Sequence, residues 1–277
     1  MSPCGDADLL VKARTVLLDA LEALRQYQTA VVVIGAQAIY LHTGAAEVAL
    51  PEATKDSDLA LDTRVLPTDP RFEDAMTAAG FRQFGNPGNW QDHRGIPVDL
   101  MVPEALAGAA AKGRRGIRVE PFGKESARRA VGLEAAVIDH SLMPIPALAA
   151  GDDRVVSAKV AGPAALLVAK LHKIGERQGA GSRRLINDKD AHDAYRLLVA
   201  TPTAHLAGQI NQLRADELAG SVTEQALTYL REMFAAGPSA LGSTMAGRAE
   251  QGVGDPATVA ASVSFLAMDL LESTGNA

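Results

Sequence analysis

The chain has 277 residues, of which 47% are hydrophobic, 22% charged and 4% aromatic, and its formal net charge at pH 7 is −6. This length can bury a sizeable core in one large domain or in two lobes, and the composition is that of a globular protein rather than a disordered or fibrous one. The negative net charge argues against a protein coated with basic residues for indiscriminate binding to nucleic acid.

Cysteine content and hydropathy indicate the compartment. The single cysteine, Cys4, excludes an intramolecular disulfide and fits a reducing environment. The first residues lack the basic segment and apolar stretch of a signal peptide, and no run approaches the roughly 18 apolar residues of a membrane span. We therefore expect a cytoplasmic protein with no membrane partner.

The first part of the chain predicts a helix, a strand and a second helix. Apolar residues recur at helical spacing from Asp6 to Tyr27, residues 29–34 are mostly β-branched, and residues 36–42 are typical of a short helix. Gly35 lies at the turn from strand to helix. A glycine there lets backbone amides approach a ligand, and the N-terminus of the helix favours anions such as phosphate. Most turns of this kind contain a small residue, so the glycine alone is a weak signal.

An acidic pair follows a polar loop over residues 44–55. Asp56 and Asp58 open an alternating apolar run that predicts a short strand, and side chains two residues apart on a strand share a face. Two adjacent carboxylates repel each other, and a hard divalent cation such as Mg²⁺ removes that conflict. The structural alternative is that Asp56 ends a loop and Asp58 caps a turn.

A third acid lies further along the chain. The sequence next predicts a helix and three short strands, over residues 70–79, 81–84, 89–91 and 95–101. Asp99 lies within the last of these, and an acid in an apolar strand is costly unless it is paired, hydrogen-bonded or bound to metal. If Asp56, Asp58 and Asp99 converge, they form the kind of site that two-metal nucleotidyl transfer needs. A local hydrogen bond is the alternative for Asp99.

A basic stretch covers residues 111–129, where seven basic and two acidic side chains leave an excess of five positive charges. The basic residues are Lys112, Arg114, Arg115, Arg118, Lys124, Arg128 and Arg129. Such a surface could follow the backbone of a polyanion, and a solvated charged loop is an equal alternative. Strands are predicted over residues 135–145 and 154–160, after which the α/β part is expected to end.

The remainder of the chain has helical periodicity. Pro163 opens a predicted helix through Ile174, and Asn187 is placed to cap the next, which carries an acidic cluster around Asp190. That cluster also has a structural interpretation, as an i,i+4 pair of Lys189 with Asp193 and as acids at a helix N-terminus. Three more helices are predicted over residues 203–219, 221–236 and 256–272, with a Gly/Ser-rich break at 237–254.

Together these motifs resemble a known family. Val33-Ile34-Gly35-Ala36-Gln37-Ala38, then Thr54-x-Asp56-x-Asp58 and the strand with Asp99, are similar to the polymerase-β-type nucleotidyltransferase core. Lys170-Leu171-x-x-Ile174-x-x-Arg177 and Lys189-Asp190-x-x-Asp193 are similar to the C-terminal motifs of its AbiEii branch, which includes the MenT-type toxins of bacterial toxin-antitoxin pairs. The similarity covers roughly residues 30–200, and its order and spacing are fairly specific.

The resemblance implies an α+β fold, with a polymerase-β-like nucleotidyltransferase lobe over residues 1–160 and an all-helical lobe over 161–277. The first lobe would contain a mixed or antiparallel sheet. Asp56, Asp58 and Asp99 would hold Mg²⁺ or Mn²⁺, and Asp99 would help to deprotonate the acceptor hydroxyl. Nucleotide contacts would come from Gly35, Ala36, Ser57, Lys170, Arg177 and Lys189. Lys170 would also serve catalysis, with Asp190 or Asp193 positioning the nucleotide or supporting the reaction.

The implied activity is Mg²⁺-dependent transfer of NMP from an NTP to RNA, with the 3′ end of tRNA as the expected acceptor. The chain would be a monomeric toxin neutralised by a cognate antitoxin protein. The family usually has Gly-Gly or Gly-Ser where Gly35-Ala36 stands, so a hydroxyl contact to phosphate is missing here. Transfer to a protein hydroxyl stays open. The rivals are an aminoglycoside-type nucleotidyltransferase, which would need an acidic acceptor pocket, and a non-catalytic nucleotide-binding or partner-binding protein.

Overall fold

The computed structural model describes residues 3–44, 46, 48, 55–109, 115–179 and 188–275. Two compact units divide the chain. The first, called the sheet unit, comprises Met1–Ala38 and Ala53–Ala161, and the second, called the helical unit, comprises Ile39–Glu52 and Gly162–Ala277. Residues 39–52 therefore group with the C-terminal helices, whereas the sequence placed them in the first lobe.

The strands, all in the sheet unit, are β1 (Val31–Ile34), β2 (Ser57–Leu61), β3 (Arg82–Gln83), β4 (Asn89–Gln91), β5 (Pro97–Pro103), β6 (Arg128–Ala130), β7 (His140–Pro146) and β8 (Val155–Ala161). The helices of this unit are α1 (Pro3–Ala23), α3 (Phe72–Ala78) and the 3₁₀ turns η1 (Arg25–Tyr27) and η2 (Glu104–Leu106). Helix α2 (Gly35–Thr43) belongs to the sheet unit through Ala38 and to the helical unit from Ile39.

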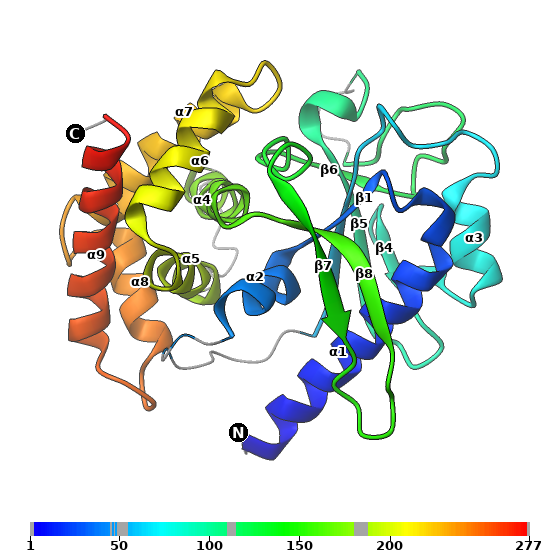
Figure 1. Cartoon of the computed structure of the whole chain (residues 1–277), viewed down its shortest axis with the longest axis horizontal. Coiled ribbons are helices and arrows are strands. Elements are labelled where there is room, and N and C mark those ends of the chain that lie inside the picture. The colour runs from blue at the N-terminus through cyan, green and yellow to red at the C-terminus, as the bar shows by residue number, and fades with distance from the viewer. Residues whose placement is uncertain are drawn as a thin grey trace. The chain divides into compact units, whose positions relative to one another are not determined.

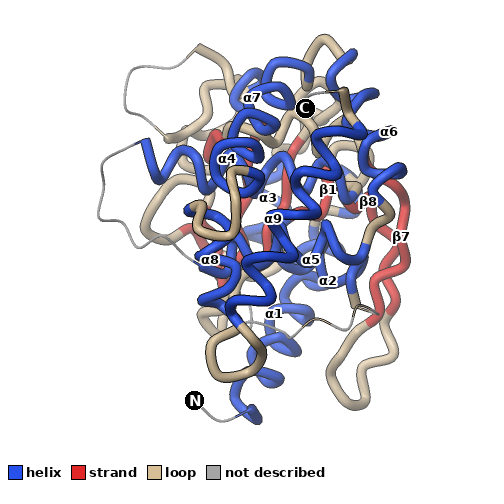
Figure 2. The backbone as a smooth tube through the Cα atoms, turned by 90° about the vertical axis from the view of Figure 1, so that its left-hand side faces the viewer, coloured by secondary structure: helices blue, strands red, loops and turns tan. Residues whose placement is uncertain are grey.

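The helical unit contains α4 (Pro163–Gly179), α5 (Asp188–Ala200), α6 (Thr203–Ala215), α7 (Gly220–Leu230), the π-helical segment η3 (Arg231–Ala235), α8 (Leu241–Ala249) and α9 (Pro256–Ser273). Helices α5, α8 and α9 pack on one another, and Figure 2 shows them side by side. Gly242 of α8 lies directly against the ring of Phe234, where a Cβ atom would overlap the ring carbons. The glycine therefore permits close packing of α8 on η3.

Within the described residues, the strands form one mixed sheet in the order β3-β4-β5-β2-β1-β8-β7, with β6 also pairing with β5 (Figure 1). Strands β1 and β2 run antiparallel, β2 and β5 parallel, β1 and β8 parallel, and β7 and β8 antiparallel. All four residues of β1 are buried, as expected for a central strand with both faces covered.

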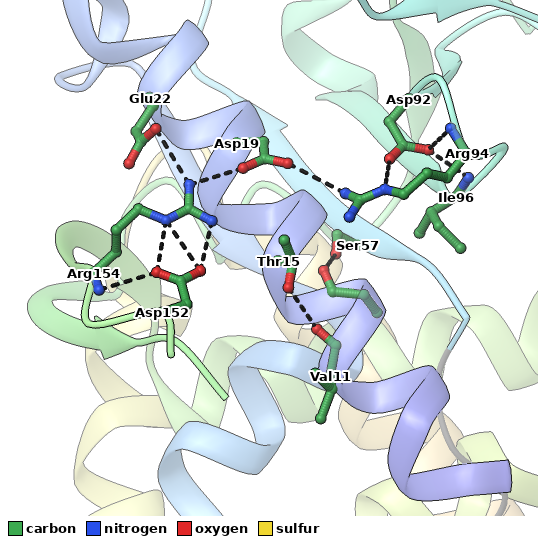
Figure 3. A network of polar contacts seen from close by, with 11 residues as sticks. Val11, Thr15, Asp19, Glu22, Ser57, Asp92, Arg94, Ile96, Asp152 and Arg154 are labelled. Carbon is green, nitrogen blue, oxygen red and sulfur yellow. Dashed lines mark hydrogen bonds and ion pairs between the residues drawn. The ribbon is translucent and has the colours of Figure 1, made fainter. Parts of the chain in front are cut away.

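Helix α1 lies across the sheet and contacts β2, β5 and β8. Its apolar stripe is buried, through Ala13, Val16, Leu17, Ala20 and Leu21. Its polar side carries Asp19, which joins Arg94 (3.3 Å) in the turn before β5 to Arg154 (2.8 Å) in the turn before β8 (Figure 3). The helix is thus held to the sheet by apolar burial and by ion pairs to two separate turns.

The prediction of a mixed sheet followed by a helical C-terminal region is confirmed, and assignment to a polymerase-β-like nucleotidyltransferase fold stays a prediction. Two details of the sequence interpretation were wrong. Strand β7 begins at His140, since residues 135–139 form turns, and the predicted break at 237–254 contains helix α8. Strand β6, at the end of the basic stretch, was not predicted. Several predicted features lie outside the described residues, namely Thr54, Lys112, Arg114 and the cap Asn187.

Across the ranges that the structure describes, we find no helix with the length and apolar character needed to cross a bilayer.

Candidate functional site

Two of the three predicted acids lie next to each other in the sheet. The parallel register of β2 and β5 makes Asp58 the direct partner of Asp99. On its other side, Asp58 is the partner of Ile34, the last residue of β1. Adjacent strands lie about 4.8 Å apart, so the register brings the two acidic residues together at the backbone.

Gly35 shapes the surroundings of Asp58. Its φ of +68° falls in the left-handed region that favours glycine, and a Cβ atom at this position would overlap the Asp58 carboxylate. The carboxylate therefore packs directly against the backbone at the start of α2. The first amides of a helix have no partners within the helix and carry partial positive charge. The sequence predicted that the backbone of Gly35 and Ala36 contacts phosphate, and this contact stays a prediction.

Alternation along β2 separates Ser57 from the acids beside it. The Ser57 side chain is fully buried, and its hydroxyl donates to the Ala13 carbonyl of α1 over 2.9 Å. Asp58 points to the opposite face of the sheet. The hydroxyl of Ser57 is thus engaged by the core, which leaves only backbone groups for the nucleotide contact predicted there. Asp56 lies half-buried just before β2 begins.

Asp99 has a basic partner that the sequence did not predict. Arg128 of β6 donates from Nη2 to Asp99 Oδ2 over 3.2 Å, and both side chains are partly buried. The sequence treated Arg128 as part of a basic surface. Its role depends on the pairing of β6 with β5, which aligns Arg128 with Met101, and no local pattern signals that long-range pairing.

The structure does not assemble Asp56, Asp58 and Asp99 into a ligand cage. In the described ranges, no three acidic, histidine or cysteine side chains lie close enough to one another to hold a metal ion. Carboxylate oxygens are nonetheless the donors that Mg²⁺ and Mn²⁺ prefer, and Asp58 and Asp99 are register neighbours. The donor chemistry fits a hard divalent cation, provided that Asp99 exchanges Arg128 for it. The metal role of the three acids stays a prediction.

A second charged group lies in the helical unit, between α4 and α5. Lys170 is buried, with 7% of the residue exposed. Its ammonium group contacts Asp190 over 2.9 Å and Asp193 over 2.7 Å. Lys173 and Arg177 also contact the Asp190 carboxylate, over 3.1 Å and 2.7 Å respectively. The face of α4 that carries Lys170, Lys173 and Arg177 thus packs against the first turns of α5.

Electrostatics fix the ionised forms of this cluster. Burial alone would lower the pKa of Lys170, but the carboxylates of Asp190 and Asp193 outweigh it and raise that pKa well above its ordinary value. Burial would raise the pKa of Asp190, and the charge of Lys170, followed by that of Lys173, moves it well below its ordinary value. Lys170 is therefore a charged group held inside the protein rather than a lysine extended into solvent.

The sequence suggested an i,i+4 pair of Lys189 with Asp193, and the structure gives Asp193 a basic partner on another helix. Asp193 is fully buried and meets Lys170 across the helices, and its Oδ1 accepts no hydrogen bond from the residues that the structure describes. Lys189 lies half-buried in the first turn of α5. A buried carboxylate oxygen without a hydrogen bond is unusual and costly, which makes Asp193 a candidate for direct contact with a ligand.

Sequence reasoning missed a third polar group near the same helix. The Nε2 atom of His192 lies 2.6 Å from Glu250 Oε1, and both side chains are buried. Fully buried Arg196 donates to the carbonyl oxygens of Thr43 and Val48. The contacts of Arg196 tie the last residue of α2, and Val48 beyond it, to α5 within the helical unit. The sequence carries no signal for them, because each partner lies far along the chain.

Comparisons with known proteins assign neither a family nor a function to the chain. No protein-family model matches the chain, and no curated protein matches it. One solved structure, described as "Crystal structure of JHP933 from Helicobacter pylori", aligns with 96% of this chain and 93% of its own at 10% sequence identity and a TM-score of 0.41. A similarity this distant carries no statement about function.

Proposed function

We propose that the protein is a Mg²⁺-dependent nucleotidyltransferase that moves NMP from an NTP to a hydroxyl acceptor and releases pyrophosphate. The observation that carries the proposal is the register of β2 and β5, which makes Asp58 the partner of Asp99 while Gly35 leaves room for the Asp58 carboxylate. Two carboxylates beside a helix N-terminus combine donors for a divalent cation with backbone amides for a phosphate.

The proposed chemistry is a single displacement. The acceptor hydroxyl oxygen bonds to the α-phosphorus, the bond from that phosphorus to the pyrophosphate oxygen breaks, and the hydroxyl proton leaves. Asp99 is the proposed proton acceptor, and the backbone at Gly35 and Ala36 orients the triphosphate. When bound by Asp56, Asp58 and Asp99, Mg²⁺ supplies charge neutralisation for the phosphates and makes the hydroxyl easier to deprotonate.

In the helical unit, we assign different roles to the three basic residues of α4. Lys170 is enclosed by two carboxylates, so we propose that it positions Asp190 and Asp193. The side chain of Lys173 is 48% exposed and that of Arg177 is 32% exposed, which leaves both accessible to phosphate oxygens. Three cations around Asp190 and Asp193 also leave this cluster with an excess positive charge, which favours an anionic ligand.

RNA is the acceptor that we propose, with the 3′ end of tRNA as the specific site. Arg115, Arg118 and Lys124 of the predicted basic stretch are exposed, and none forms an ion pair with a described residue. Exposed and uncompensated basic side chains suit a phosphate backbone, and they disfavour a cationic aminoglycoside. The toxin role and the cognate antitoxin protein are proposed from the family resemblance alone.

The test is incubation of the purified protein with Mg²⁺ and each α-phosphate-labelled NTP, together with total RNA, purified tRNA, an aminoglycoside or bulk protein. Label on tRNA supports both the proposed activity and the proposed acceptor. Label on other RNA supports the activity and contradicts tRNA as the acceptor. Label on the aminoglycoside or on protein assigns the acceptor to those classes. Retained NTP binding without any transfer would contradict the enzymatic proposal and support a binding protein.

A further inference from the structure

The sheet is incomplete between β1 and β8, where the first residues of β8 form an open edge on the β1 side. Strand β7 pairs with β8 along its whole length, from Val155 to Ala161, whereas β1 is in register only with Lys159 and Val160. This difference arises because β1 begins at Val31, and the preceding residues turn away into η1. The first three residues of β8 therefore have a strand neighbour on one side only.

The hydrogen-bond pattern shows which groups face the open side. Ala147 N–H donates to the Arg154 carbonyl, and in an antiparallel pair alternate residues bond to the same neighbour. Val155 and Ser157 therefore direct their backbone groups away from β7, in agreement with proline at the positions opposite them, Pro146 and Pro144. Within the described chain, no backbone group pairs with the N–H or C=O of Val155 or with the N–H of Ser157.

A cavity of about 370 Å³ lies along this open edge, within the sheet unit. Its lining consists of the start of β8, the end of α1 with η1, and the first residue of β1, through Leu21, Glu22, Leu24, Arg25, Gln28, Val31 and Val155 to Ala158. Leu21 and Leu24 are buried and form an apolar wall, while Val155 is 61% exposed. The volume falls in the usual range for ligand sites, about 300–1,000 Å³.

The charges at the rim indicate what the cavity would accept. Glu22 lies 3.3 Å from Arg154 and so has an ion partner, which it shares with Asp19 and Asp152 (Figure 3). Arg25 is exposed and forms no ion pair with the residues that the structure describes. Of the two charged residues that line the cavity, Arg25 is therefore the one whose charge has no ion partner among the described residues, and this charge complements an acidic side chain.

We propose that this edge binds an extended peptide segment of another protein, which adds a strand beside Val155–Ser157 and carries an acidic residue facing Arg25. The open backbone groups demand an extended chain, since only a strand offers donors and acceptors at the matching spacing. Three residues of β8 correspond to about 10 Å of strand, so the bound segment has three or four residues. The apolar wall accepts the side chains that point toward α1.

The probe is a synthetic peptide, acetyl-TVEVT-amide, compared with acetyl-TVKVT-amide and with a backbone N-methylated form of the first. Amide hydrogen exchange and chemical shifts of the intact protein report where each peptide binds. We expect the glutamate peptide to slow exchange at Val155 and Ser157, the lysine peptide to bind up to about fivefold more weakly, as one exposed ion pair allows, and the N-methylated peptide not to bind.

Two substitutions test the contacts separately. Ser157→Pro removes the N–H on the open side without removing a bond to β7, and we expect about tenfold weaker binding of the glutamate peptide. Arg25→Glu should reverse the preference between the two peptides and leaves the backbone unchanged. If Ser157→Pro fails to fold, this variant still tests whether the peptide binds beside Arg25. Arg71→Glu, a charge reversal at an exposed ion pair with Asp74, is the control and should retain the wild-type preference.

Three results would overturn the proposal. The first is unchanged exchange at Val155 and Ser157 at saturating peptide. The second is equal binding of the glutamate and lysine peptides by both the wild type and Arg25→Glu. The third is self-association of the peptide-free protein that is lost in Ser157→Pro, because a second copy of the chain would then be the occupant of the edge.

Discussion

Arg128 donates from Nη2 to Asp99 Oδ2 over 3.2 Å and so links β6 to β5 beside Asp58. The guanidinium compensates the charge of one of the two carboxylates that the parallel register brings together. A divalent cation that uses Asp99 must compete with Arg128 for the same oxygen. This ion pair is therefore expected to weaken metal binding, and its removal gives a direct reading of whether Asp99 is a ligand.

The first prediction is that Arg128→Gln binds Mn²⁺ more tightly than the wild type. Because a partly exposed ion pair contributes about 0.2–1 kcal/mol, the gain should be at most about fivefold. Electron paramagnetic resonance or calorimetry of the purified protein measures it. Arg129→Gln is the matched control, since the neighbouring arginine pairs with Glu104 instead and should leave Mn²⁺ affinity unchanged. Identical affinities in the wild type and Arg128→Gln would remove Asp99 from the ligand set.

The second prediction concerns the glycine at the start of α2. Gly35→Ala adds a Cβ atom that overlaps Asp58, and Gly80→Ala is the matched control because its φ is +88° and its added Cβ meets nothing within 4 Å. Both variants carry the cost of a left-handed backbone at alanine, about 1–2 kcal/mol. Overpacking should cost Gly35→Ala about 1–3 kcal/mol more in the free energy of unfolding. Equal losses in urea denaturation would show that Asp58 moves away freely.

The third prediction is that Lys170→Met destabilises the fold strongly. The substitution leaves Asp193 buried without its counter-ion, while Asp190 keeps Lys173 and Arg177, and breaking a buried pair in this way costs about 3–5 kcal/mol. Arg248→Gln breaks the exposed pair with Asp188 and should cost at most about 1 kcal/mol. Denaturant midpoints of the two variants provide the comparison. A Lys170 variant as stable as Arg248→Gln would mean that the carboxylates take up protons or other partners at little cost.

The fourth prediction is the pH dependence of stability that this cluster imposes. The pKa of Asp190 is lower in the folded protein than in the unfolded chain, so its stabilisation is present above the ordinary value of about 3.9 and is lost as the pH falls below it. The pKa of Lys170 is raised, so its contribution is complete below about 10.4 and is lost only at higher pH. The cluster should therefore stabilise the fold fully between about pH 4 and pH 10.

Urea denaturation of the wild type and of Asp190→Asn over the acidic range measures this dependence. The wild type should lose stability more steeply than the variant below about pH 4, because only the wild type must protonate Asp190 on unfolding. Parallel curves for the two proteins would show that other carboxylates determine the acid limb.

Much of this arrangement could be predicted from the sequence because its signals are local. The β-branched run before Gly35 and the alternating run after Asp56 predicted β1 and β2, and the apolar strand around Asp99 predicted its neighbour. A helix at 241–249 could not be predicted in the same way, since glycines there resemble a break. In the fold, Gly242 instead permits contact of α8 with Phe234.

The partners of the charged groups could not be predicted from the sequence. Arg128 meets Asp99 only through the pairing of β6 with β5, and Lys170 is buried only because α5 brings two carboxylates to it. Similarly, the Ser57 hydroxyl is taken by Ala13 of a helix that lies far upstream. Helical or strand spacing places a side chain on a face, but long-range packing decides what that face meets.

The proposed nucleotidyl transfer depends on the carboxylates that the register of β2 and β5 brings together. We therefore compare the rate of transfer from α-phosphate-labelled NTP to purified tRNA by Asp58→Asn with that by Asp74→Asn, which changes an exposed acid that pairs with Arg71. We expect wild-type transfer by Asp74→Asn and a loss of at least about a hundredfold by Asp58→Asn with folding intact, because a group needed in the transition state is removed. Equal transfer rates in the two variants would contradict it.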